Sequence, residues 1–130
     1  MRTEVQFDVP WPPSVNRYWR HGRGRVYLAE PGRHYIELIR QSMPLFHDPW
    51  ETEHLRLVVM AHPPDRRKRD LDNILKALLD GLEKGSLFRD DSQIKHIEAR
   101  MLEPVRPKGL VHLIVGVIHE PWTTDKECHP

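Results

Sequence analysis

The chain has 130 residues, of which 38% are hydrophobic and 30% are charged, and its formal net charge is +1. This length suffices for one domain with a single core, and the composition excludes a disordered chain. We expect no membrane span and no secretion, because no run of roughly 18 to 20 apolar residues occurs and the N-terminal segment lacks an apolar signal core. The single cysteine, Cys128, excludes a disulfide framework and favours a cytoplasmic location.

The first predicted element is a strand. Apolar and polar residues alternate over residues 3–9, which is the period of a half-buried strand, and Pro10 ends it. Residues 11–13 (WPP) then force extended backbone. Residues 16–25 contain two glycines among arginines, and this composition predicts a basic, mobile loop.

Two helices and an interior strand follow. Apolar residues recur at helical spacing over residues 32–46, where Pro44 is expected to kink or end the helix. Residues 55–61 are rich in branched side chains and predict an interior strand. The clearest helical period runs over residues 71–84, and Gly85 stands where a C-terminal glycine cap belongs.

The last predicted elements are strands at residues 93–102 and 110–119, most simply an antiparallel pair. We expect a flexible tail at residues 121–130. The chain therefore predicts an α+β fold, a small mixed sheet of about four strands with two helices packed on one face, in one domain of residues 1–120.

Two acidic pairs flank the strongest helix. Asp70 and Asp72 stand two residues apart before it, so in extended backbone their carboxylates could converge on one hard cation; either could instead cap the helix. Asp90 and Asp91 follow the helix and could be turn residues only. A 14-residue helix carries the chain about 20 Å, so the pairs can meet only if residues 85–91 run back along it.

Clusters of basic residues accompany these acids. Metal-assisted phosphodiester hydrolysis needs both, because cations activate water while basic side chains hold the flanking phosphates. Carboxylates without cysteine or histidine at ligand spacing favour Mg²⁺ or Mn²⁺ over Zn²⁺. Solvated surface charge is the alternative explanation of the basic clusters. Their members are Arg66, Arg67, Lys68 and Arg69 before the helix, and Arg17, Arg20, Arg23 and Arg25 in the early loop.

Other residues near these clusters have two interpretations. Lys76 could contact phosphate or pair with Asp72 or Asp80 one turn away. Tyr18 and Trp19 could stack on exposed bases or pack in the core. We take the remaining acidic residues of this region as structural, namely Asp65, Asp80 and Glu83.

The assembled motifs resemble the RusA family of Holliday junction resolvases. The resemblance rests on PDRRKRDLDNILKALLDGL, on LFRDD and on the early PWPPSVNRYWRHGRGR, and it extends over about residues 5–118. It implies a Mg²⁺-dependent, homodimeric endonuclease, bacterial or phage-encoded, that resolves four-way DNA junctions by paired symmetric cuts. A two-fold dimer presents two equivalent sites to two equivalent strands.

The resemblance also implies roles for individual residues. The family's essential acids fall on Asp70, Asp72 and Asp91, and its lysine falls on Lys76. Asp90 matches the other acidic position of the second pair and is a further candidate metal ligand. Arg66 to Arg69 and the arginines of residues 17–25 would hold the DNA arms.

Two rival functions, and a structural dimer with an incidental acidic cluster, remain open at this point. A non-catalytic module that binds branched DNA would use the acids only as caps and turn formers. A metal-dependent phosphohydrolase with a small substrate would need a closed phosphate pocket, for which the sequence offers no glycine loop.

Overall fold

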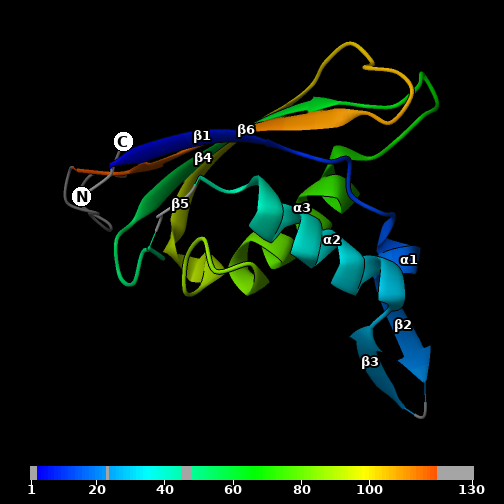
Figure 1. Ribbon diagram of the computed structural model, residues 1–130, viewed down its shortest axis with the longest axis horizontal. Coiled ribbons are helices and arrows are strands. Elements are labelled where there is room, and N and C mark those ends of the chain that lie inside the picture. Colours follow the sequence, from blue (N-terminus) through cyan, green and yellow to red (C-terminus); the bar gives the residue numbers. More distant parts are fainter. Residues whose placement is uncertain (1–2, 23, 45–47, 120–130) are drawn as a thin grey trace, which may run out of the picture.

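The computed structural model describes residues 3–22, 24–44 and 48–119 of the chain. A four-stranded sheet carries the two longer helices on one face, and a small hairpin projects beyond the helices (Figure 1). The predicted α+β fold is confirmed. The elements in chain order are β1 (Glu4–Val9), α1 (Val15–Tyr18), β2 (Trp19–Gly22), β3 (Arg25–Leu28), α2 (Glu30–Ser42), β4 (Leu55–His62), α3 (Leu71–Lys84), a 3-10 helix η1 (Asp91–Gln93), β5 (Ile94–Met101) and β6 (Leu110–Val117).

The strand order of the main sheet is β1-β6-β4-β5, in which β4 and β5 are parallel and the other neighbours are antiparallel. The predicted pairing of the last two strands is therefore wrong, because β4 lies between them. The chain from β5 to β6 crosses the end of β4, where Leu102 N–H donates to Ala61 O and Val105 N–H donates to Pro63 O. The interior position predicted for residues 55–61 is confirmed.

The core lies between this sheet and the two longer helices. Alternate residues of β4 face the helices, and Leu55, Leu57 and Val59 are fully buried. On the helical side, α3 contributes Leu78 and α2 contributes Ile39, both also fully buried. This packing fixes the orientation of α3, the helix that separates the two acidic pairs.

Both bounds of α2 differ from the predicted ones, whereas α3 has the predicted bounds. Helix α2 spans Glu30–Ser42 instead of residues 32–46, because Pro31 is tolerated in the first turn and the helix ends before Pro44. Helix α3 ends at Lys84 and Gly85 is its C-cap residue, as predicted. Gly85 has a φ of −77°, and the left-handed residue is Ser86, with a φ of 72°. Gly85 instead permits close helix packing, since a Cβ there would lie 3.2 Å from Cγ2 of Ile39.

The predicted basic loop at residues 16–25 is also wrong, because this segment contributes to α1 and to the β2–β3 hairpin. Gly24 has a φ of 77°, a left-handed conformation that glycine adopts readily and that suits a hairpin turn. Arg23 and the predicted tail at residues 121–130 lie outside the described residues. Within the described ranges, none of the helices has the length and apolar character that a membrane span requires.

Candidate active site

Asp70 and Asp72 stand at the start of α3. Asp70 is the N-cap residue, in extended backbone with a φ of −94°, yet its side chain accepts no capping hydrogen bond. Both residues are exposed. Neither carboxylate has a hydrogen bond or ion pair to another described residue, so the capping interpretation is not supported for Asp70 and both carboxylates are open to a cation.

Lys76 lies one helical turn beyond Asp72 and is exposed. It makes no ion pair within the described part of the chain. Asp80, one of its two possible partners, instead accepts a hydrogen bond from Lys84 and another from Tyr18. The Lys76 ammonium group therefore stays available to an anionic ligand on the same face of α3 as Asp72.

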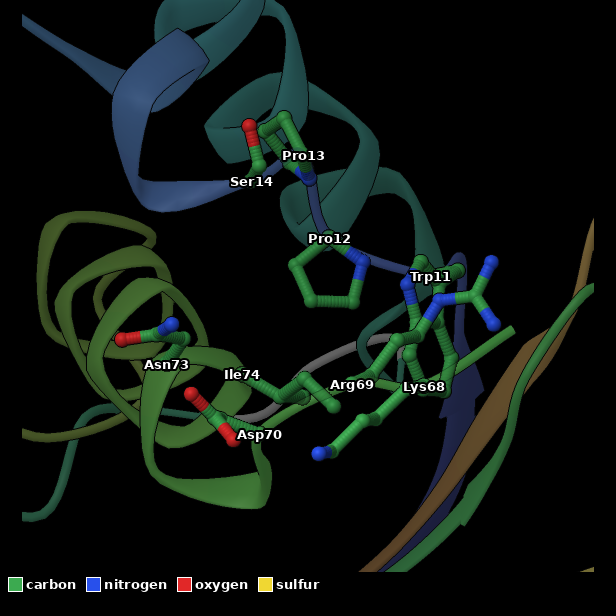
Figure 2. Close-up of a pocket in the computed structure, with 9 residues that line it drawn as sticks. All are labelled: Trp11, Pro12, Pro13, Ser14, Lys68, Arg69, Asp70, Asn73 and Ile74. Atoms are coloured by element: carbon green, nitrogen blue, oxygen red, sulfur yellow. The ribbon is translucent and has the colours of Figure 1, made fainter.

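An open groove of about 690 Å³ runs beside the start of α3. Figure 2 shows the chain before α1 along one side and the first turn of α3 along the other. Asp70 is the carboxylate in its lining, and Lys68 supplies an ammonium group. The lining residues are Trp11, Pro12, Pro13, Ser14, Lys68, Arg69, Asp70, Asn73 and Ile74.

The four basic residues before α3 are not equivalent. Arg67 and Arg69 both bind Asp65, at 3.0 Å and 2.8 Å, and Arg66 pairs with Glu103 at 2.8 Å. The hydrogen bond from Arg67, followed by that from Arg69, holds the pKa of Asp65 far below its usual range. Lys68 has no such partner among the described residues, so it carries the uncompensated positive charge at the groove.

Arg69 also connects the basic segment before α3 to Trp11, on the opposite side of the groove. Its guanidinium carbon lies 5.7 Å from the centre of the Trp11 ring, within the range of a cation–π contact. Its side chain further donates to the carbonyl oxygens of Asp65 and Arg67. Arg69 therefore shapes the groove more than it offers a free charge to a ligand.

The second acidic pair lies at the other end of α3. Asp90 caps η1 by accepting a hydrogen bond from Ser92 N–H at 2.9 Å, and this bond lowers the pKa of Asp90. Asp91 donates its backbone N–H to Oε1 of Glu83 at 2.8 Å. One carboxylate oxygen from each of Glu83, Asp90 and Asp91 lies within 4.8 Å of the others, so the three could hold a metal ion.

The two acidic pairs do not meet within one chain. Residues 87–89 turn away from the helix to bind Trp50, whose N–H donates to Leu87 O and whose carbonyl accepts from Arg89 N–H. The predicted condition for a meeting, a return along α3, is therefore not fulfilled. Asp72 and Glu83 are separated along the axis by about 16 Å, the rise of eleven helical residues.

The aromatic and basic residues of the segment 17–25 differ in how deeply they are buried. Tyr18 is fully buried, which decides for core packing, and Trp19 is half-buried with its ring centre 4.2 Å from that of Tyr18. Arg17 is exposed. Arg20 and Arg25 belong to β2 and β3, but their side chains and all of Arg23 lie outside the described residues.

Sequence reasoning missed two features of this region. It took Glu83 as structural, although its spacing of eleven residues from Asp72 places both on one face of a helix with 3.6 residues per turn. It also assigned no role to Trp11, whose position opposite Arg69 depends on the packing of separate segments. The helical periodicity indicates only the face of α3 on which Glu83 lies; neither its contact with Asp91 nor the position of Trp11 has a signal in the sequence.

Exposed carboxylates beside a basic groove are typical of proteins that bind a divalent cation together with a polyanion. The family model described as endodeoxyribonuclease RusA matches residues 10–113. The chain belongs to this RusA family.

Individual relatives support the same assignment. A crossover junction endodeoxyribonuclease of Enterobacteria phage HK97 is 40% identical over 107 residues, which cover 82% of this chain and 88% of the relative. Proteins of the same description from Enterobacteria phage 82 and Escherichia coli strain K12 are 38% and 37% identical over 112 residues, with 82% of this chain and 89% of each relative covered.

Proposed function

We propose that this protein is an endonuclease that resolves four-way DNA junctions by paired symmetric cleavage, in the cytoplasm of a bacterium. The relatives named above carry the crossover junction activity in their descriptions. One observation on this chain supports the transfer most directly. Asp70 and Asp72 stand exposed and unpaired among the described residues, next to a groove that also contains Lys68 and Arg69.

We propose that the groove binds one strand of DNA. Its open form suits a continuous polymer better than a small phosphorylated substrate, which would need an enclosed pocket. Lys68 would bind a backbone phosphate, and the Trp11 ring would lie beside the strand. Binding here would bring a phosphodiester to Asp70 at the start of α3, where the helix dipole also favours negative charge.

The donor set fits Mg²⁺, with Mn²⁺ as a substitute. Each acidic candidate offers carboxylate oxygen, the ligand that these hard cations prefer, and their exposure leaves room for retained water. The proposed ligands are Asp70, Asp72 and Asp91, with Asp90 as a further candidate. When bound, the cation supplies Lewis-acid activation of water and of the phosphate.

The protein's own side chains would do the remaining work. The carboxylates of Asp70 and Asp72 would orient the reacting groups, and Lys76 would stabilise the negative charge that develops on the phosphate. Asp90 already has a structural hydrogen bond to Ser92, so we assign it a smaller part than Asp91. Arg17, Arg20, Arg23 and Arg25 would hold a junction arm through its backbone.

We further propose that each site is completed by two subunits of a homodimer. The separation of about 16 Å along α3 prevents Asp72 and the Glu83 end of the same helix from sharing one cation. Two α3 helices packed antiparallel about a two-fold axis would place the Asp70 end of one beside the Asp91 end of the other. A dimer would thus contain two equivalent sites, one for each strand to be cut.

An exposed apolar surface supports a partner subunit on this side. Ile97 and Met101 of β5 pair in register with buried residues of β4, so they face the helical layer, yet they are 43% and 37% exposed. Leu75 and Leu79 of α3 are only half-buried. A second copy on α3 and β5 would cover these side chains.

Cleavage of a synthetic junction tests this function. The protein is incubated with a four-way DNA junction in Mg²⁺ or in EDTA, beside a linear duplex of the same sequence. We expect paired symmetric nicks on the junction with Mg²⁺ only. Asp70→Asn should bind the junction at least as tightly without cutting it, because a negative charge near phosphate is removed. Binding by the wild type without any cut would instead favour a non-catalytic junction-binding module.

A further inference from the structure

We propose that the β2–β3 hairpin is a DNA-contacting arm whose Tyr27 ring stacks on an unpaired base at the centre of the junction. This inference rests on the proposed function and adds a substrate-recognition residue to it. Figure 1 shows the hairpin beyond the end of the helical layer, well apart from the main sheet. The arm is thus free to reach a ligand that the groove beside α3 does not contact.

The root of the arm is held firmly by the core. Tyr18 immediately precedes β2 and is fully buried, and its hydroxyl donates to Asp80 of α3 at 2.6 Å. Its carbonyl oxygen accepts the N–H of Ala29, the residue after β3, at 2.9 Å. Both strands of the arm are therefore fixed at their base, and a ligand bound at the tip would be positioned relative to α3.

The arm exposes two apolar residues that are consecutive in β3 and therefore face opposite sides of the hairpin. Val26 is 55% exposed and Tyr27 is 47% exposed. The Tyr27 ring lies against the backbone of Gly22, since a Cβ there would be only 3.0 Å from Cε1 of the ring. The missing side chain of Gly22 thus leaves room for the hydroxyl end of the Tyr27 ring beside the opposite strand, and this contact favours one orientation of the ring.

The charge of the surrounding chain indicates the kind of partner. Residues 9–29 contain four arginines and no acidic residue, so the arm is strongly cationic. An aromatic ring among arginines is the combination with which proteins bind unpaired nucleotides, because every base offers a face for stacking and the arginines meet the phosphates. A second copy of this chain would carry the same positive charge on its β2–β3 hairpin, so contact between the hairpins of two subunits is disfavoured.

The junction supplies the required base. Helical stacking is interrupted where the four duplexes of the junction meet, so the base pairs there open at a lower cost than those within a continuous duplex. A cationic arm that binds such a base would recognise the branch itself, whereas phosphate contacts alone would bind any duplex. The arm would therefore contribute selectivity for junctions over linear DNA.

Photocrosslinking in EDTA tests this contact without cleavage. A junction with 5-iododeoxyuridine at each central position in turn is irradiated with the wild-type protein, and the crosslinked peptide is sequenced. We expect a crosslink at Tyr27 with the junction and none with a linear duplex of the same sequence. Tyr27→Ala should lower affinity for the junction about tenfold and leave duplex affinity unchanged, while Tyr27→Phe should retain junction affinity.

Controls separate this inference from the proposed function. Val105→Ala removes another apolar side chain, 40% exposed, away from the arm and should bind junctions as the wild type does. If the wild type cuts junctions but Tyr27 neither crosslinks nor affects affinity, the arm inference is wrong and the nuclease proposal stands. If sedimentation shows that Tyr27→Ala changes the oligomeric state, the arm contacts a second copy and the inference is overturned. If the wild type does not bind junctions, both proposals fail.

Discussion

Replacing Tyr18 by phenylalanine should destabilise the protein by about 1.5–2 kcal/mol. The ring stays buried, so the change removes only the hydroxyl that donates to Asp80 at 2.6 Å. A hydrogen bond to a charged group contributes about 1.5–3 kcal/mol. We expect the lower part of that range, because the Asp80 side chain keeps its ion pair with Lys84 and is 20% exposed to water.

Equilibrium unfolding in urea, followed by circular dichroism at pH 7, measures this change. Tyr35→Phe is the matched control: Tyr35 is equally buried, but its hydroxyl donates to the neutral carbonyl of Pro10 at 2.8 Å. Its loss should cost about 0.5–1.5 kcal/mol. The m-values should not change, because both variants expose the same surface on unfolding as the wild type.

The pH dependence gives a second test of the same bond. Burial first, and then the hydrogen bond and charge of Asp80, raise the pKa of Tyr18 above its ordinary value of 10.0. A raised pKa contributes stability that is present below pH 10 and is lost as the pH rises above it. The difference between wild type and Tyr18→Phe should therefore shrink above pH 10. A variant as stable as the wild type at pH 7, with no change in this difference, would refute the assigned role of Tyr18.

Three further predictions concern the groove, the acidic pair and the hairpin root. For junction binding, Lys68→Ala should lower the slope of log affinity against log salt concentration by about one. Arg67→Ala should change this slope less, because Arg67 is already bound to Asp65. Equal slopes for the two variants in a filter-binding titration would contradict this difference. Asp90→Ala should cost about 1 kcal/mol of stability through the lost cap of η1, while Asp91→Asn should abolish cleavage with little effect on thermal unfolding. Gly32→Ala should destabilise the protein by about 1–2 kcal/mol despite the better helix propensity of alanine, because its Cβ would lie 2.6 Å from the Tyr18 carbonyl oxygen. An unchanged or higher Tm would show that the backbone at Tyr18 moves to accept the added methyl group.

Local patterns predicted most of the elements but not their neighbours. The apolar period of residues 71–84 specified α3 to the residue, since burial on one face depends on sequence spacing alone. The pairing of β5 with β4 was not predictable, because a strand's own alternation carries no information about the strand beside it. The β2–β3 hairpin was not predicted, because the arginines around Gly22 and Gly24 interrupt the alternation of apolar and polar residues that indicates a strand.

The candidate site shows the same limit. The sequence placed Asp70 and Asp72 together through their spacing, and the structure keeps both carboxylates exposed at one end of α3. It could not show that Glu83 joins Asp91, because that contact depends on the turn after the helix and on Trp50, 38 residues before Phe88 along the chain. Long-range packing of this kind leaves no periodic trace.

Subunit mixing tests the central claim of a composite site most directly. Asp72→Asn and Asp91→Asn proteins, each inactive alone, are mixed, allowed to exchange subunits and assayed on a four-way junction in Mg²⁺. In a site built from two subunits, each mixed dimer regains one intact site, so random exchange should restore about a quarter of the wild-type nicking rate, as single nicks. If each site instead lies within one subunit, every site in the mixture carries a substitution, and the absence of nicking after verified subunit exchange would contradict the account.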